Sequence, residues 1–320
     1  MAEEILKMVN ITKRFAGITA LDRVQFSCSK GEVHVLAGEN GAGKSTILKI
    51  LAGIHQADEG EIYFHGKKVV IRNPEQSQKL GIAMVFQELT LVGEMTVWEN
   101  IYLNQEPVTR LGRINRKEIK KRILDVMDRY GIHIDPDAPV GSLPVAEQQM
   151  AEILKILVRD PELIILDEPT SALAKKEVEQ LYQIIHNLIA DGKTIIFISH
   201  RLEELFELGD RITVFKDGCY IGTRNMNEIN EDDLIRMMVG RSLNHVFPPP
   251  VCEVDDSQVI FEVKDLADAD HKLNQVSFQV HKGEILGVAG LQGHGQTELL
   301  NAVSGLYPLS GGSIIVNGKQ

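Results

Sequence analysis

The chain has 320 residues, of which 43% are hydrophobic and 25% are charged, and this composition excludes a mainly disordered protein. Its 34 Lys and Arg residues stand against 45 Asp and Glu residues, which gives a net charge of −11. Proteins that bind a phosphate backbone usually carry the opposite sign, so we expect no nucleic-acid partner.

Short apolar runs alternate with longer helical stretches over the first 240 residues. Strands are expected at 5–11, 24–28, 33–37, 62–64, 82–85, 163–167, 194–198, 211–216 and 219–222. Helices are expected at 44–53, 74–80, 96–102, 116–130, 146–159, 175–190, 201–208 and 231–239. This alternation predicts an α/β fold with a largely parallel core sheet. Residues 88–160 are mostly helical, which predicts a helical insertion between two sheet-forming parts.

The sequence changes character after residue 240. Residues 241–258 hold three consecutive prolines and predict an extended linker. Beyond it, residues 283–320 align without gaps with residues 31–68, and 12 of the 38 aligned residues are identical. Glycines keep their spacing throughout, so we infer a duplication: a complete unit over 1–240 and the opening of a second over 259–320. The second copy stops at Gln320.

A glycine-rich segment between an apolar run and a helix matches the pattern G-x-x-x-x-G-K-[ST]. Its residues are Gly38, Glu39, Asn40, Gly41, Ala42, Gly43, Lys44, Ser45 and Thr46. Such a loop directs backbone N–H groups at phosphate oxygens, and a helix N-terminus behind it adds positive potential. Lys44 would reach the β- and γ-phosphates, and the Ser45 hydroxyl would ligate Mg²⁺. The motif predicts nucleotide binding, which many enzyme classes share.

Two acids follow the apolar run 163–166. Asp167 is placed to hold Mg²⁺, and the Glu168 carboxylate could polarise an attacking water. Two acids at the end of a strand are also common on protein surfaces, but the phosphate-loop motif favours the functional interpretation.

Three further positions each allow two interpretations. His200 follows the strand 194–199 and could contact a γ-phosphate, although a lone His there is more often a surface or capping residue. Gln87 follows the strand 82–86 and could ligate Mg²⁺ and sense a partner, or be a polar strand end. Phe15 could stack on a base or belong to the core.

Taken in order, these residues resemble the nucleotide-binding subunits of ABC transporters. The resemblance covers Phe15, GENGAGKST at 38–46, Gln87, LDEPTSAL at 166–173 and His200. The two-copy layout, the stretches AGENGAGKSTILKILAG and FQELTLVGEMTVWENIYL, and the FPP-containing linker are similar to the ATPases of monosaccharide importers, which serve ribose, galactose, xylose and similar sugars. The resemblance implies a P-loop NTPase of the ABC type, with a mixed core sheet and a helical insertion subdomain.

The resemblance also implies an activity and its partners. The chain would be an ATPase that uses ATP and Mg²⁺, with Asp167 as the Mg²⁺ carboxylate, Glu168 as the catalytic base and His200 as the γ-phosphate switch. It would lie at the cytoplasmic face of the bacterial cell membrane. There it would receive a helix of an integral-membrane permease and depend indirectly on an extracytoplasmic sugar-binding protein.

Three segments depart from the family pattern. The signature, usually similar to Leu-Ser-Gly-Gly-Gln, aligns with LPVAE at 143–147, where Pro144 has neither a hydroxyl nor an N–H. In the second copy's loop, 290–297, Gln296 replaces the lysine, and Ala174 stands where an acid is expected. In this family two units sandwich ATP, each loop facing the other unit's signature. The resemblance therefore implies one competent and one degenerate site, formed with a second ABC unit or a dimer partner.

Two other functions stay open at this point. A soluble ABC ATPase acting on ribosomes or DNA would also carry two units, but the charge of −11 and the lack of a basic linker disfavour it. A non-catalytic nucleotide-binding fragment would be consistent with the stop at Gln320.

Overall fold

The computed structural model describes residues 3–109, 112–239, 255–269, 272–290 and 294–319. It divides into two compact units, Met1–Leu243 and Asn244–Gln320. Most of the expected linker, residues 241–254, lies outside the described residues. The expected end of the linker at residue 258 is wrong by four residues. Strand β11 already begins at Asp255, because the backbone there pairs with Lys282.

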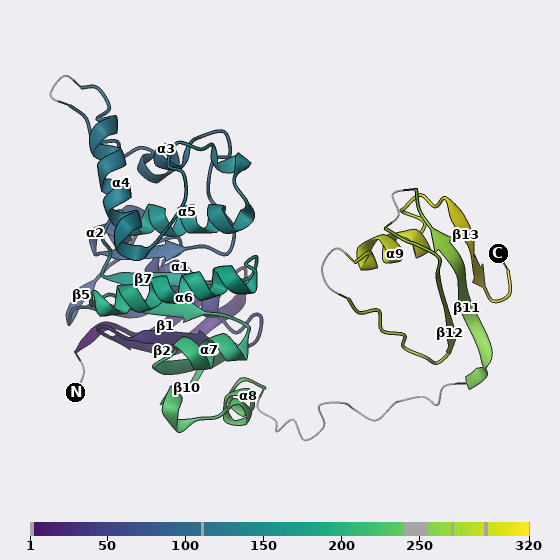
Figure 1. Cartoon of the computed structure of the whole chain (residues 1–320). Helices are drawn as coiled ribbons and strands as arrows, with labels where there is room; N and C mark the ends of the chain where they lie inside the picture. Colours follow the sequence, from purple (N-terminus) through teal and green to yellow (C-terminus); the bar gives the residue numbers. More distant parts are fainter. Residues whose placement is uncertain (1–2, 110–111, 240–254, 270–271, 291–293, 320) are drawn as a thin grey trace. The chain divides into compact units, whose positions relative to one another are not determined.

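Each expected strand and helix of the first unit overlaps an observed one (Figure 1). The strands are β1 (Glu4–Phe15), β2 (Ile18–Ser29), β3 (Val33–Ala37), β4 (Glu59–Phe64), β5 (Lys67–Val69), β6 (Ile82–Val85), β7 (Leu163–Asp167), β8 (Thr194–Ile198), β9 (Arg211–Lys216) and β10 (Cys219–Asn225). The α-helices are α1 (Lys44–Leu51), α2 (Pro74–Lys79), α3 (Val97–Tyr102), α4 (Arg116–Tyr130), α5 (Val145–Leu157), α6 (Lys175–Ala190), α7 (Leu202–Leu208) and α8 (Glu231–Val239), and two 3₁₀ turns are η1 (Val140–Ser142) and η2 (Met226–Glu228).

Two sheets make up the first unit. The six-stranded sheet has the order β10-β9-β3-β8-β7-β6. Its strands are parallel except β10, which is antiparallel to β9, so the expected largely parallel core sheet is confirmed. The four-stranded sheet, β2-β1-β4-β5, is antiparallel, so the unit as a whole is mixed.

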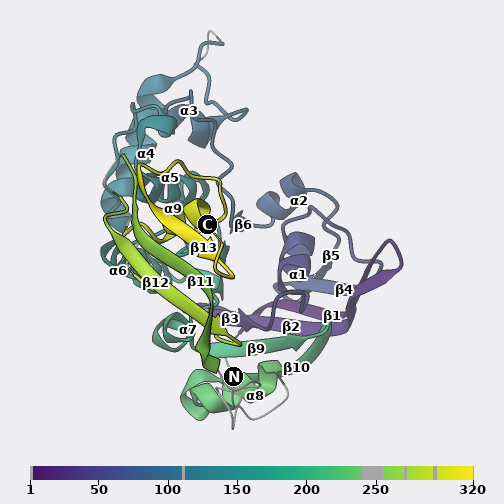
Figure 2. The same ribbon diagram turned by 90° about the vertical axis from the view of Figure 1, so that its right-hand side faces the viewer.

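The six-stranded sheet separates two hydrophobic cores, because successive side chains of a strand point to opposite faces. On β7, Ile164 and Leu166 belong to a core shared with α3, α4, α5 and α6. Leu163 and Ile165 belong to the other core, shared with α1 and the antiparallel sheet. Figure 2 shows α6 and α7 on one side of this sheet, and α1 with β1, β2 and β4 on the other. Helices α3, α4 and α5 lie between β6 and β7 in the chain and form a group at one end of the unit (Figure 1).

A buried polar network lies where β3 begins. The Glu32 carboxylate accepts hydrogen bonds from the Ser29 N–H at 2.7 Å and from Arg211 Nη1 at 3.2 Å. The fully buried His34 ring contacts Glu32 through Nδ1 at 2.9 Å and the Thr213 hydroxyl through Nε2 at 2.8 Å. The network satisfies groups from β2, β3 and β9 and fixes the N-terminal end of the central strand.

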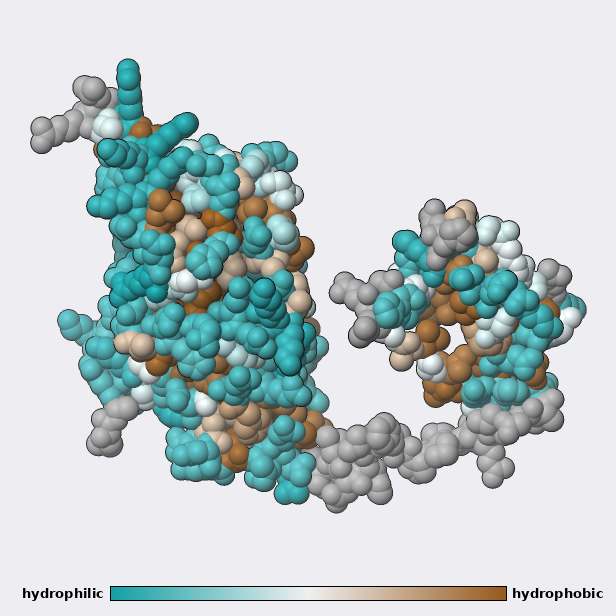
Figure 3. Space-filling view, viewed as in Figure 1, coloured by the Kyte–Doolittle hydropathy of each residue, from teal (hydrophilic) through white to brown (hydrophobic). Residues whose placement is uncertain are grey.

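The second unit repeats part of the first. Its sheet β12-β11-β13, formed by β11 (Asp255–Ala267), β12 (Val276–Lys282) and β13 (Gly311–Val316), has the same order as β2-β1-β4. Helix α9 (Gln296–Val303) occupies the positions that align with α1. Residues 285–289 align with β3 but form no strand, since no described strand of this unit takes the places of β8 and β9. The Ile285 side chain is accordingly 97% exposed, and Figure 3 shows hydrophobic residues on the visible face of this unit.

Candidate functional site: a cavity at the carboxyl ends of the parallel strands

The glycine-rich loop 38–46 connects β3 to α1, as its sequence predicts. Two of its glycines could not be replaced without displacing backbone. Gly43 has φ of +99°, and a Cβ there would lie 2.5 Å from Leu21 Cδ2 and 2.9 Å from the Ala20 carbonyl oxygen. A Cβ on Gly38 would lie 2.2 Å from the Phe215 carbonyl oxygen. At these two glycines the loop therefore lies closely against β2 and β9.

Lys44 begins α1 and folds back over the loop. Its ammonium donates hydrogen bonds to the carbonyl oxygens of Gly38 at 2.7 Å and Glu39 at 3.0 Å. Burial lowers the pKa of this ammonium below its ordinary value, while the carboxylates of Glu168 and Asp167 act in the opposite direction. The amine is held inside the curl of the loop, where a phosphate group could replace the carbonyl oxygens as its partner.

A cavity of about 700 Å³ opens above this loop, at the carboxyl ends of the parallel strands. Its lining comes from three loop segments that follow β3, β6 and β7, and from the end of β8. The lining residues are Asn40, Gly41, Gly43, Lys44, Ser45, Thr46, Gln87, Asp167, Glu168, Ile198 and His200. The structure thus brings together all the polar residues that the sequence singled out as strand-end candidates.

Glu168 is the centre of the polar contacts in this cavity. Its carboxylate Oε2 accepts a hydrogen bond from Gln87 Nε2 at 3.1 Å and lies 3.4 Å from His200 Nδ1. The residue has a left-handed backbone with φ of +50°, stabilised by a hydrogen bond from its N–H to the Ile198 carbonyl oxygen at 3.0 Å. Such a backbone is costly for a residue with a side chain, and strain of this kind concentrates at functional sites.

Asp167 is the last residue of β7 and is only 6% exposed. Burial raises the pKa of its carboxyl, and the adjacent charge of Glu168 raises it further, while Lys44 and Lys49 lower it. Its carboxylate, the Ser45 hydroxyl and the Gln87 amide oxygen form a set of hard oxygen donors around one cavity, and such donors suit Mg²⁺. The chemistry of the donor set therefore fits a magnesium–phosphate complex.

Phe15 lies outside the residues that line this cavity. It ends β1 and is 39% exposed. Its ring packs against His55 in a T-shaped arrangement, with the ring centroids 5.0 Å apart, and Lys13 Nζ lies 5.3 Å from the ring centroid. The aromatic ring is held in place and partly open to solvent, as base stacking requires.

The segments that depart from the family pattern lie at helix N-termini. Pro144 immediately precedes α5, no side-chain hydrogen bond caps that helix, and Val145 is 51% exposed at its first position. Ala174 precedes α6, and its N–H donates to the Glu177 carboxylate at 2.6 Å. In the second unit Gln296 begins α9 as Lys44 begins α1, while Leu291, Gln292 and Gly293 of that loop lie outside the described residues.

Two buried acids at the edge of the site escaped the sequence analysis. Glu152 on α5 is 5% exposed and accepts hydrogen bonds from the N–H and the hydroxyl of Thr90, three residues after Gln87. Glu204 on α7 is 3% exposed and contacts the chain beyond β7 and β8. An acid on an amphipathic helix is normally solvent-facing, so only the four-residue spacing from His200 could have drawn attention to Glu204.

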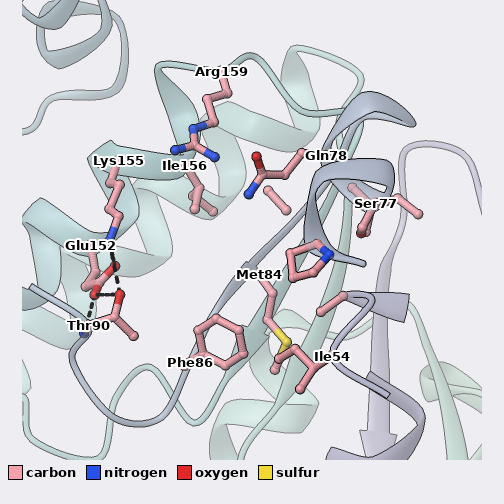
Figure 4. Close-up of a pocket in the computed structure, with 14 residues that line it drawn as sticks. Ile54, Ser77, Gln78, Met84, Phe86, Thr90, Glu152, Lys155, Ile156 and Arg159 are labelled. Carbon is pink, nitrogen blue, oxygen red and sulfur yellow. Dashed lines mark hydrogen bonds and ion pairs between the residues drawn. The ribbon is translucent and has the colours of Figure 1, made fainter. Parts of the chain in front are cut away.

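A second, mostly apolar cavity of about 280 Å³ lies between α2, β6 and α5 (Figure 4). Ile54, Met84, Phe86 and Ile156 are among its apolar residues. The Arg159 guanidinium reaches into it, and burial lowers its pKa. Within the described residues Arg159 has no ion-pair partner, whereas Lys155 is tied to Thr90 at 3.0 Å. The cavity therefore lies between the core sheet, through β6, and the helical insertion, through α5.

Among the helices of the described residues, none combines the length and the apolar character that a bilayer crossing requires.

A family model described as "ABC transporter" matches residues 21–171 and 273–320. A protein of Burkholderia cenocepacia is 46% identical over 319 residues, which make up 100% of this chain and 60% of that protein. A protein of Agrobacterium fabrum is 47% identical over 318 residues, 99% of this chain and 61% of that protein. Both names include the words "ribose/galactose/methyl galactoside import ATP-binding protein". The chain spans about three fifths of the length of these relatives.

Solved structures give the same fold. The ADP conformation of MJ1267, an ATP-binding cassette of an ABC transporter, matches with a TM-score of 0.65 and 27% identity, over 74% of this chain and 99% of that one. The dimeric post-hydrolysis state of the cassette MJ0796, bound to ADP and Pi, matches with a TM-score of 0.60 and 28% identity, over 69% of this chain and 99% of that one. The expected fold class, an α/β P-loop NTPase with a mixed sheet and helical insertion, is confirmed.

Proposed function

The chain belongs to the ABC transporter family of ATP-binding proteins, and on that premise we propose that its first unit binds and hydrolyses ATP to power the import of a monosaccharide. One observation carries the enzymatic part of this proposal. Lys44, Ser45, Gln87, Asp167, Glu168 and His200 line a single cavity, although they come from four separate stretches of the chain. The names of the relatives support a monosaccharide as the imported molecule, and this chain matches those relatives over about three fifths of their length.

The chain's own residues supply binding, orientation and a base. The loop amides and the Lys44 ammonium bind the β- and γ-phosphates, and Ser45 and Asp167 hold the metal ion. Mg²⁺, when bound, supplies positive charge that offsets the charge building up on the phosphate oxygens. Glu168 orients a water and accepts its proton, and the amide of Gln87 and the ring of His200 fix that carboxylate from two sides.

The partner is an integral-membrane permease, and the apolar cavity beside Phe86 is its docking site. A cavity of about 280 Å³ has room for a few apolar side chains from one face of an amphipathic helix, rather than for a whole helix. Glu152 and Thr90 line this cavity and connect α5 to the segment that follows Gln87. The chain would therefore work at the cytoplasmic face of the bacterial membrane, with a second ABC unit or dimer partner opposite the loop and a sugar-binding protein outside.

A nucleotide titration tests the first step. The whole chain is titrated with a fluorescent ATP analogue, with Mg²⁺ and with EDTA. We expect Lys44→Ala to weaken binding by about 10- to 100-fold, since a hydrogen bond to a charged group contributes about 1.5–3 kcal/mol. Lys121→Ala on the exposed face of α4 is the matched control. Equal affinity of the two variants would contradict the assignment of the loop.

A transport assay tests the second step. The chain is combined with the permease and the sugar-binding protein in proteoliposomes, and ATP-dependent uptake of labelled ribose or galactose is measured. Uptake of neither sugar, with ATP binding intact, would contradict sugar import and leave the ATPase proposal standing.

A further inference from the structure

Glu204 is a buried acid that touches neither the cavity nor the solvent. It lies on α7, four residues after His200, and its side chain is 4% exposed. It is not among the residues that line the nucleotide cavity. A carboxylate is expensive to bury unless hydrogen bonds satisfy it, so its contacts are informative.

Three side chains satisfy this carboxylate. Its Oε2 accepts hydrogen bonds from the Thr170 hydroxyl at 2.8 Å and from the Ser199 hydroxyl at 2.5 Å. Its Oε1 lies 3.3 Å from Arg201 Nη1. The Ser199 oxygen in turn accepts the Arg201 N–H at 3.0 Å. One oxygen of Glu204 therefore bridges two hydroxyls that belong to different loops.

These two loops carry Glu168 and His200, which both line the nucleotide cavity. Thr170 comes two residues after Glu168, and Ser199 comes directly before His200. The strands that deliver them, β7 and β8, are parallel neighbours whose last pairing is Asp167 with Ile198. Beyond that pairing the sheet no longer holds the two loops together. The backbone hydrogen bond from the Glu168 N–H to the Ile198 carbonyl oxygen connects them first, and the Glu204 bridge connects them further along.

We propose that Glu204 is a positioning residue that sets the spacing between Glu168 and His200, which is 3.4 Å in this structure. The inference rests on the proposed ATPase function, because it assigns these two residues to the reaction. A misplacement of about 1 Å at a reacting centre can lower a rate by about 10²-fold. Loss of the bridge should therefore reduce turnover without changing the phosphate loop that binds ATP.

Glu204→Gln tests this assignment, because the amide keeps the shape of the side chain. The Gln amide has one acceptor oxygen and one NH₂ group. If its oxygen accepts from the Thr170 and Ser199 hydroxyls, its NH₂ group faces Arg201, which is also a donor. Glu203→Gln, an exposed acid on the same helix, is the matched control. Thr170→Val and Ser199→Ala each remove one arm of the bridge and leave the charge in place, so they keep the test valid if Glu204→Gln unfolds.

The first readout is the NMR signal of His200 in the full chain. Ten His residues are present, and His200→Asn identifies the signal by its disappearance. We expect Glu204→Gln and Ser199→Ala to shift the His200 ring signal, as Glu168→Gln does, while Glu203→Gln leaves it unchanged. A His200 signal that is identical in Glu204→Gln and the unaltered chain would overturn the proposal.

The second readout is ATP hydrolysis by the chain assembled with its permease. We expect Glu204→Gln to lower kcat by about 10- to 100-fold with an unchanged KM for ATP. The double variant Glu204→Gln/His200→Ala should be no slower than His200→Ala alone, because the two substitutions disable the same function. Fully additive losses would overturn the positioning role. Absent ATP binding by the unaltered chain would contradict the proposed function instead, and the NMR measurement would still decide the geometry.

Discussion

The Gln87 amide nitrogen donates a 3.1 Å hydrogen bond to the Glu168 carboxylate across 81 positions of sequence. Because Gln87 follows β6 and Glu168 follows β7, a shift of the segment after β6 changes the surroundings of the proposed base directly. Glu152 fastens that same segment to α5 through Thr90. A movement of α5 relative to the sheet would therefore reach Glu168 through two hydrogen-bonded steps.

Glu168→Gln should keep ATP binding and lower turnover of the assembled transporter by about 10²–10⁴-fold, the usual effect of removing a positioned base. The amide has nearly the same shape but cannot take the proton of the attacking water. Phosphate release and nucleotide binding are measured side by side, with the exposed Glu179→Gln on α6 as control. Near-normal hydrolysis would place the base elsewhere.

The chain on its own should bind MgATP and hydrolyse it slowly, even when concentrated. Two copies that sandwich ATP would set the loop 38–46 against Pro144, which offers no donor, and Val145, which is 51% exposed at the start of α5. One lost donor to a developing negative charge lowers a rate by about 10²–10³-fold. Restoring Ser at 144 and Gly at 145 and 146 should raise phosphate release, more steeply as chain concentration rises.

Thermal unfolding is the control for this restoration. A Ser before the helix contributes a cap worth about 1 kcal/mol, whereas each Gly in the helix costs up to about 1 kcal/mol. The stability of the first unit should therefore fall by at most about 1 kcal/mol. A restored chain that gains no activity while staying folded would contradict the sandwich arrangement.

The first unit should lose stability on acidification, beginning near pH 6.5. Burial lowers the pKa of His34 in the fold, so below its ordinary pKa the unfolded chain binds a proton that the folded chain refuses. Burial alone would raise the pKa of Glu32, but hydrogen bonds from His34 and Ser29 hold it below its ordinary value, which adds a further loss below about pH 4.5.

Urea unfolding followed by Trp98 fluorescence measures this effect, since the chain has a single tryptophan and it lies in the first unit. The free energy of unfolding should fall by up to about 1.4 kcal/mol per pH unit below pH 6.5 for the one proton of His34. His34→Gln should flatten this slope, whatever its effect on stability at pH 8. Equal slopes in both proteins would rule out His34 as the source.

Arg159→Glu should weaken assembly with the permease and leave nucleotide affinity unchanged. The guanidinium is the one cation that lines the apolar cavity and has no ion-pair partner within the described residues, so a docking helix should bring a carboxylate to it. Co-purification from detergent measures assembly, and Lys121→Glu controls for added negative charge. Unchanged assembly would contradict a role of Arg159 in docking.

Much of the fold could be predicted because strand and helix signals were strong and local. Helix α4 lies at the expected 116–130, with Asn115 capping its start and Gly131 ending it in a left-handed turn. Strand β5, three residues long with two of them exposed, carries no such signal and was missed. Strands β1 and β2 extend to Phe15 and Ile18, beyond their apolar runs, because the two strands pair with each other as far as the turn.

The candidate site could be predicted from the sequence for a topological reason. Parallel strands place their carboxyl ends at one edge, so polar residues that follow separate strands converge there. Glu152 and Glu204 could not be found this way, because their roles depend on which hydroxyls their helices meet after folding. Residues 285–289 show the same limit: they align with β3 in sequence, but a strand needs hydrogen-bonding neighbours.

The central place of β3 in the sheet has a consequence for folding during synthesis on the ribosome. The Gly31 N–H bonds the Thr194 hydroxyl, 163 positions later, and the Val33 N–H bonds Asp210, 177 positions later. The glycine-rich loop thus leaves the exit tunnel long before β8 and β9 exist to support the strand beneath it. ATP binding therefore cannot stabilise the unit while it is only partly synthesised. At about 5–20 residues per second, many seconds pass before the nascent chain can bind its ligand. Until then, the apolar residues of β3 lack their sheet neighbours and remain exposed to aggregation.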